Sequence, residues 1–135
     1  MKTNELMIGD WVYNKYQQRK FRVYNVLDAC IGEKHDDGII EGHKPQYLEP
    51  IQLTPKILEK NGFESREYTD NTEYVFNDGY EVIVNFDEGL PEEDISPSIF
   101  LNIDFAEKSV VMPIEYVHQL QQAMRLMGCD KEIEL

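Results

Sequence analysis

The residues best suited to binding a metal ion lie in one short polar stretch. His35, Asp36, Asp37 and His43 offer two imidazoles and two carboxylates, a set of donors that could hold a divalent cation. Their spacing matches no known helix or knuckle arrangement, and the glycines among them indicate a loop. The sequence therefore favours a solvated turn over a metal site, and it predicts no cofactor.

Catalytic chemistry has little support elsewhere in the sequence. His118 would need an orienting partner and a nearby nucleophile, and the sequence identifies neither, so we interpret it as a structural or surface histidine. The acidic stretch 87–94 lacks the alternating acids and terminal Glu of an EF-hand loop. The sequence also contains no phosphate-binding glycine loop, Walker motif, CxxC pair or GxSxG elbow. We therefore name no catalytic residue and favour a non-catalytic protein.

Four aromatic residues near the N-terminus are the candidate binding residues. Trp11, Tyr13, Tyr16 and Tyr24 fall within one short part of the chain. Alternating aromatics can line a small groove or cage for a peptide or a cation, as in some SH3-like modules. The alternative is that these four side chains belong to the core and its rim.

Short strands joined by polar loops are expected to position these aromatics. Alternating apolar residues predict a strand at 11–13, an antiparallel partner at 21–27, and further strands near 30–31 and 38–40. This spacing is typical of a small, curled antiparallel sheet. The Gly-Asp-Trp-Val opening at 9–12 looks like the first strand of an SH3-like barrel.

A short helix should follow this sheet. Thr54 is a good N-cap, Pro55 suits the first helical position, and Gly62 suits the position just past the end. The segment between them predicts a helix of about two turns.

A β-meander and a second helix should complete the chain. Strands are predicted at 74–76 and 80–86, on either side of Asn-Asp-Gly, which is a strong hairpin signal. An acidic loop at 87–97 then leads into strands at 99–105 and 110–112. The tail from Cys129 to Leu135 could add a last extended segment.

The second helix is predicted to start at Pro113 and to end at Gly128. Its apolar positions, which recur at helical spacing, are Ile114, Val117, Leu120, Met124 and Met127. Gln121 is placed on the polar face. We therefore predict an α+β fold: a small antiparallel N-terminal sheet of SH3-like type, a short central helix, a β-meander and a C-terminal amphipathic helix. These form one domain of 135 residues, with a β subregion at 1–50 and an α+β subregion at 51–135.

The net charge of −13 is concentrated in one part of the chain. Residues 64–107 hold thirteen acids and a single base, Arg66, whereas residues 1–63 hold nine acids and nine bases. Such a surface would repel a phosphate backbone, so we expect no direct nucleic-acid binding. The acids either form a solubilising surface or dock on something basic.

The expected cellular location is inferred from the apolar segments of the sequence. It has no long apolar run that could cross a membrane and no apolar segment of a signal peptide near its start. We therefore expect a cytoplasmic protein, in which Cys30 and Cys129 are reduced thiols.

Three stretches carry a resemblance that spans nearly the whole chain. At NELMIGDWV (4–12), PIQLTPKIL (50–58) and YVHQLQ (116–121), the chain resembles small uncharacterised proteins of Bacteroides-type gut anaerobes, often encoded in their phages and mobile elements. It departs from them after Gln121, where Gln122-Ala123-Met124 replaces a more aromatic continuation. The resemblance implies a genomic context and no catalytic residues.

Three functions remain open at this point. The first is a non-catalytic interaction module that binds a protein partner through the aromatic sheet or the acidic middle. The second is an acidic nucleic-acid mimic that blocks a host DNA-binding protein, which requires the acids of 64–107 to lie on one surface. The third is a small enzyme, which requires a pocket with converging polar groups.

Overall fold

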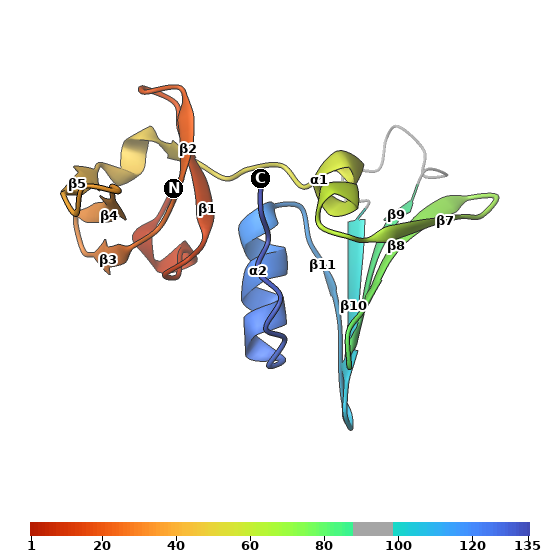
Figure 1. Cartoon of the computed structure of the whole chain (residues 1–135). Helices are drawn as coiled ribbons and strands as arrows, with labels where there is room; N and C mark the ends of the chain where they lie inside the picture. Colours follow the sequence, from red (N-terminus) through yellow and green to blue (C-terminus); the bar gives the residue numbers. More distant parts are fainter. Residues whose placement is uncertain (88–98) are drawn as a thin grey trace. The chain divides into compact units, whose positions relative to one another are not determined.

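The computed structural model describes residues 1–87 and 99–135, so most of the predicted acidic loop at 87–97 lies outside the described residues. The chain forms two compact units. The N-terminal unit is Met1–Gln52 with Tyr116–His118, and the C-terminal unit comprises the described residues of Leu53–Glu115 with Gln119–Leu135. Antiparallel sheets and two α-helices give an α+β fold (Figure 1).

The N-terminal unit contains two three-stranded antiparallel sheets, in the orders β2-β1-β6 and β3-β4-β5. Its elements are η1 (Thr3–Glu5), β1 (Trp11–Asn14), β2 (Arg19–Arg22), β3 (Asn25–Leu27), β4 (Cys30–Lys34), β5 (Ile40–His43), η2 (Pro45–Tyr47) and β6 (Leu48–Glu49).

The strand predicted at 21–27 is divided in two, because the chain leaves one sheet for the other there. The Val23 amide donates to Asp10 O beside the first sheet, whereas the Tyr24 amide donates to Gly32 O in the second. Alternation along these strands places the core between the sheets. That core is Leu6, Val12, Phe21, Val23, Ile31 and Leu48.

The C-terminal unit is built on one five-stranded antiparallel sheet in the order β11-β10-β9-β8-β7. Its elements are α1 (Pro55–Lys60), β7 (Glu64–Glu67), β8 (Asn71–Asn77), β9 (Glu81–Asp87), β10 (Ile99–Phe105), β11 (Lys108–Pro113) and α2 (Val117–Leu126), whose first residues group with the N-terminal unit.

Helix α1 begins and ends as its sequence predicts. Thr54 Oγ1 accepts a hydrogen bond from the Ile57 amide at 3.3 Å, which satisfies one of the otherwise unpaired N–H groups of the first turn. Gly62 follows the helix with φ +85°, a left-handed conformation that side chains rarely adopt.

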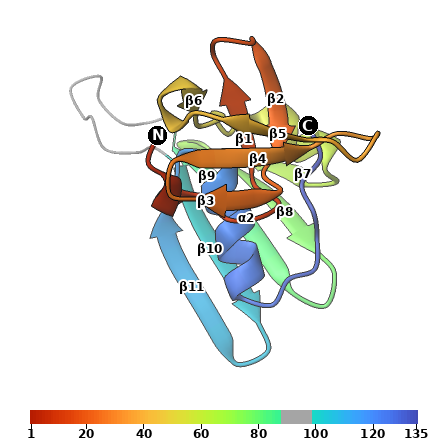
Figure 2. The same ribbon diagram turned by 90° about the vertical axis from the view of Figure 1, so that its left-hand side faces the viewer.

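One face of the five-stranded sheet, here called the inner face, is apolar and buried. Val82 and Val84 of β9 pair with Ile103 and Leu101 of β10, and all four side chains are fully buried. Helix α2 runs across this face in both views of the ribbon (Figures 1 and 2). The adjacent Gly128 lies against the ring of Phe105, another inner-face residue.

Two predictions about α2 are wrong. Gln121 is only 3% exposed, because positions three and four residues apart share a helix face and it lies between Val117 and Met124. Pro113 ends β11 instead of starting the helix. The backbone of 114–116 is still engaged in extended pairing, with Ile114 N donating to Ile99 O, and the helix begins only at Val117.

Two other expectations concern the tail and the cysteines. The tail beyond Cys129 contains no strand, but Ile133 is buried and the Asn61 side chain bonds both backbone groups of Glu134. Cys30 and Cys129 are both free. Among the described residues, no helix is long and apolar enough to cross a membrane.

Candidate functional site

The four candidate aromatics of the N-terminal unit are not gathered into one cage. Trp11 and Tyr13 share the half-buried face of β1, and the Arg22 guanidinium lies 4.9 Å from the centre of the Trp11 ring. Tyr24 instead has the Lys34 ammonium over its ring at 5.3 Å. Each of these cations occupies one face of its ring, where a ligand cation would otherwise bind.

Tyr16 is exposed and belongs to a different surface. Its ring stacks on Tyr47, with 5.3 Å between ring centres. A hollow of about 210 Å³ lies beside this pair, and of the four candidates only Tyr16 lines it. Its other lining residues are Asn14, Gln17, Gly42, His43, Lys44 and Tyr47.

The structure brings His35 and His43 together, but with glutamates in place of Asp36 and Asp37. His43 Nε2 lies 2.9 Å from Glu33 Oε1, and His35 Nε2 lies 2.8 Å from Glu41 Oε1. Sequence reasoning missed both glutamates, because only the register of β4 and β5 places Glu33 opposite Glu41.

Arg19 holds these two glutamates together. Its guanidinium donates twice to Glu33, at 2.7 and 2.6 Å, and once to Glu41 at 3.2 Å. Burial by itself would raise the pKa of Glu33, but the hydrogen bonds from Arg19 and His43 outweigh it and the pKa is lowered. The pKa of Glu41 is lowered as well, first by a hydrogen bond from Gln17 and then by His35.

Asn14 determines which ring nitrogen of His43 carries the proton, and so whether the cluster suits a metal ion. Donor atoms of Glu33, Glu41 and His43 lie within 4.8 Å of one another, which suits a metal ion. However, Asn14 Oδ1 accepts from the amides of residues 16 and 17, so its NH₂ group faces His43 Nδ1 at 2.8 Å and must donate to it. The imidazole proton therefore lies on Nε2 and is donated to Glu33. A metal at Nε2 would need that proton on Nδ1, against the Asn14 NH₂ group. The cluster is thus a satisfied ion-pair network.

His118 is a core residue. It is buried and its ring stacks on Tyr116. Burial lowers its pKa, although the nearby Asp10 and Glu5 act in the opposite direction. The ring thus lies in the interior of the N-terminal unit, and its Nδ1 has no hydrogen-bond partner among the described residues.

The face of the five-stranded sheet opposite the inner face, here called the outer face, gathers acidic side chains. Because successive strand residues point to opposite faces, the register of the five strands shows which residues share it. The carboxylates on the outer face are Glu64, Glu73, Glu81, Asp87 and Asp104. The sequence predicted an excess of acid here, and the register places these five acids on one surface.

Apolar and amide groups lie among these acids. Phe100 is 42% exposed and Val111 is 69% exposed. Asn102 pairs with Val111, and Asn85 pairs with Phe100. The side-chain oxygens of Asn85 and Asn102 are buried and have no hydrogen-bond partner among the described residues. An acceptor left in this state typically costs about 1–3 kcal/mol.

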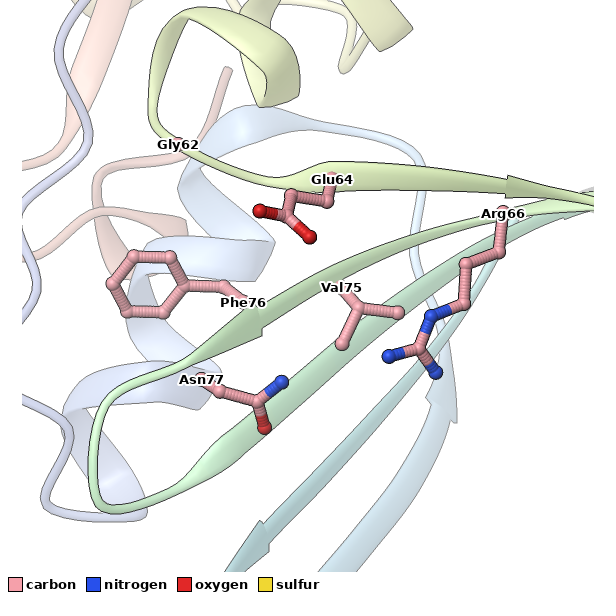
Figure 3. Close-up of a pocket in the computed structure, with 6 residues that line it drawn as sticks. All are labelled: Gly62, Glu64, Arg66, Val75, Phe76 and Asn77. Carbon is pink, nitrogen blue, oxygen red and sulfur yellow. The ribbon is translucent and has the colours of Figure 1, made fainter.

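A small hollow opens on the outer face between β7 and β8 (Figure 3). Its volume is about 160 Å³, and Glu64, Arg66 and Asn77 project on the same side around Val75. Arg66 is the only base in residues 64–107. Because ligand pockets usually measure about 300–1,000 Å³, this hollow suits a single side chain better than a small-molecule substrate.

Comparisons with known proteins found no matching family model, no matching curated protein and no matching solved structure. The outer face is therefore chosen as the candidate site on its own chemistry. It combines excess negative charge, exposed apolar side chains and buried acceptors for which the described residues provide no donor.

Proposed function

We propose that this protein is a non-catalytic interaction module, of phage or mobile-element origin, that binds a basic protein partner through the outer face. The observation that carries the proposal is the exposure of Phe100 and Val111 on a face whose five strands bring five carboxylates and a single base, Arg66. The resemblance of the chain to small proteins of mobile elements supports the origin. A cytoplasmic location is part of the same proposal.

Charge favours a basic partner. Residues 64–107 cannot neutralise their own acids with one arginine, and Glu81 and Asp104 stand directly opposite each other on β9 and β10. Like charges in that position repel. A lysine or arginine brought by a partner would relieve this repulsion and would also speed the encounter.

Apolar contact would supply most of the affinity. Binding energy in protein interfaces is concentrated in a few well-packed side chains, often aromatic and near the centre of the patch. Phe100 is the exposed aromatic side chain of the outer face, and it lies beside Asn85 of β9 and Pro113 of β11. Donors on a partner would also satisfy the Asn85 and Asn102 oxygens after rotation of these side chains.

The N-terminal unit is proposed to be an SH3-like barrel. What supports this is its strand order. The chain passes from one small sheet to the other at Val23–Tyr24, and the turn η2 leads into β6, which pairs back with β1.

The alignment of acids on one face favours a second candidate, the nucleic-acid mimic. A mimic would present carboxylates in place of phosphates, and its target would be a DNA-binding protein. The exposed Phe100 has no counterpart in a phosphate backbone, which ranks this function second.

Binding of a labelled peptide of alternating lysine and valine, followed by fluorescence anisotropy, tests the proposal. Neutralising the outer face with Glu73→Gln/Glu81→Gln/Asp104→Asn should weaken binding about ten-fold, equivalent to about 1.4 kcal/mol. The matched control, Glu67→Gln/Asp70→Asn/Glu107→Gln, makes the same change of charge at exposed positions off this face.

The control triple should weaken binding much less, and Phe100→Ala should weaken it without any change of charge. Equal effects of the two triples, or no binding of the peptide, would overturn the proposal. If the outer triple acts and Phe100→Ala has no effect, the mimic becomes the better function.

A further inference from the structure

We infer that the partner adds an extended basic segment to the five-stranded sheet, as a sixth strand along the open side of β11. This inference rests on the proposed function and describes how the same surface would hold its partner. It depends on three features of β11: the backbone groups that no described strand pairs with, its composition and the charges near it.

Backbone geometry shows which groups of β11 are open. The Ile114 amide donates to Ile99 O at 3.0 Å, so these two residues form a hydrogen-bonded pair. Such pairs alternate along an antiparallel ladder, so Met112, Val110 and Lys108 also bond to β10. The N–H and C=O groups of Ser109 and Val111 therefore point away from β10.

The two edge strands of the sheet differ in how they are protected. β7 is four residues long, fully exposed and carries three charges, which discourages pairing with another strand. β11 contains four uncharged residues, Ser109–Met112, between Lys108 and Pro113. It is an edge strand of the sheet, and no described strand pairs with the edge of β11 that points away from β10 (Figure 2). An open, uncharged edge of this kind is a template for strand addition.

The charges on the sheet select the occupant. A second copy of β11 would place two acidic sheets side by side, each carrying Asp104 near the seam, in a chain of net charge −13. A basic segment would be attracted to the acidic sheet, whereas a second acidic sheet would be repelled by it. Its side chains would alternate, with long basic residues on the outer face beside Ser109, from where they reach across β11 toward Asp104, and apolar residues beside Val110 and Met112 on the inner face.

Proline substitution at the open edge separates strand addition from folding. Val111→Pro removes an N–H that bonds to nothing in β10, and proline is tolerated on edge strands where the missing N–H faces solvent. Val111→Ala is the matched control, because it shortens the side chain and keeps the N–H. Ser109→Pro is a second variant of the same design, for use if Val111→Pro does not fold.

The probe is the alternating lysine–valine peptide, measured by anisotropy after a thermal melt has confirmed folding. We expect Val111→Pro to weaken binding at least about ten-fold relative to Val111→Ala. In the unaltered protein, the amides of Ser109 and Val111 should become protected from hydrogen exchange when the peptide binds. Those of Val110 and Met112 should be protected without it.

The outcomes separate this inference from the proposed function. If the outer-face triple weakens binding and Val111→Pro binds like Val111→Ala, strand addition is wrong and the function stands. If neither change affects binding, both are wrong. If the free protein is a dimer in sedimentation and Val111→Pro makes it a monomer, a second copy occupies the edge and the inference is overturned.

Discussion

The two units of this protein treat charge in opposite ways. In the N-terminal unit, Arg19 bridges Glu33 and Glu41, and two histidines complete the network. On the outer face of the C-terminal unit, Glu81 and Asp104 stand directly opposite each other, and Arg66 opposite Glu73 is the one base that the five strands bring to this face. Charge therefore contributes to the fold of the first unit, whereas on the second it stays largely unbalanced, as the proposed binding of a basic partner requires.

This difference begins in the composition. Residues 1–63 hold equal numbers of acids and bases, so folding can pair them, whereas residues 64–107 have one base for thirteen acids. The stability of the C-terminal unit must then come from its apolar side chains. Removing a buried apolar side chain from this unit should therefore lower its free energy of unfolding strongly. Removing a surface charge should change the free energy of unfolding little or raise it.

The largest effect is expected from Leu120→Ala. Leu120 is fully buried in α2, and removing its side chain leaves a cavity that typically costs about 2–5 kcal/mol. The matched control is Leu126→Ala in the same helix, because Leu126 is 79% exposed and should change stability by about 0.5 kcal/mol or less. Denaturant unfolding of both variants measures the difference. Equal losses, or none, would show that α2 is not part of the apolar core.

A smaller loss is expected from Glu33→Gln in the N-terminal unit. Glu33 is 12% exposed and accepts hydrogen bonds from both Arg19 and His43. Hydrogen bonds to charged groups contribute about 1.5–3 kcal/mol, and the partial exposure of Arg19 reduces this to about 1–2 kcal/mol. The control is Glu49→Gln, which removes a half-exposed pair with Lys15 at 3.9 Å and should change stability little. Similar losses in the two variants would contradict the network.

The same network predicts a direction of pH dependence. The pKa values of Glu33 and Glu41 are lowered from an ordinary value of 4.5, so the folded state holds these protons less tightly than the unfolded state. Their contribution to stability is present above pH 4.5 and is lost as the pH falls through the lowered values. The gap in stability between the parent and Glu33→Gln should therefore narrow below pH 4.5. A gap that stays constant down to about pH 3 would show that Glu33 acts through packing alone.

Local patterns in the sequence were enough to predict α1, the hairpin of 74–76 with 80–86, the strand at 99–105, and the burial of Leu120. They failed where the reason was not local. β7 was missed because Glu-Ser-Arg-Glu has no apolar periodicity and forms a strand only by pairing with β8. The start of α2 was placed too early because Ile114 fits the helical pattern although its backbone is still paired with Ile99.

The candidate site was predictable only in part. The excess of acids in 64–107 is plain in the sequence, but their common face depends on the register of five strands. The Arg19–Glu33–His43 network likewise brings together residues from three strands. The aromatics chosen from the sequence have separate neighbours, because their spacing does not reveal that Arg22 lies over Trp11, Lys34 over Tyr24 and Tyr47 against Tyr16.

The smallest change in stability is expected from Glu81→Gln, and it should be a gain where the other variants show losses. Glu81 lies directly opposite Asp104 across β9 and β10, and like charges in this position typically destabilise a sheet by about 0.2–1 kcal/mol. Removing one charge should therefore raise stability by a few tenths of a kcal/mol, and Asp104→Asn should do the same. The double variant should gain less than the sum of the two, because the second change no longer removes a repulsion. High salt should shrink both single gains, since exposed charges are screened. Loss of stability in both single variants would mean that these carboxylates are satisfied within the fold, as in the N-terminal unit, and are not held for a basic partner.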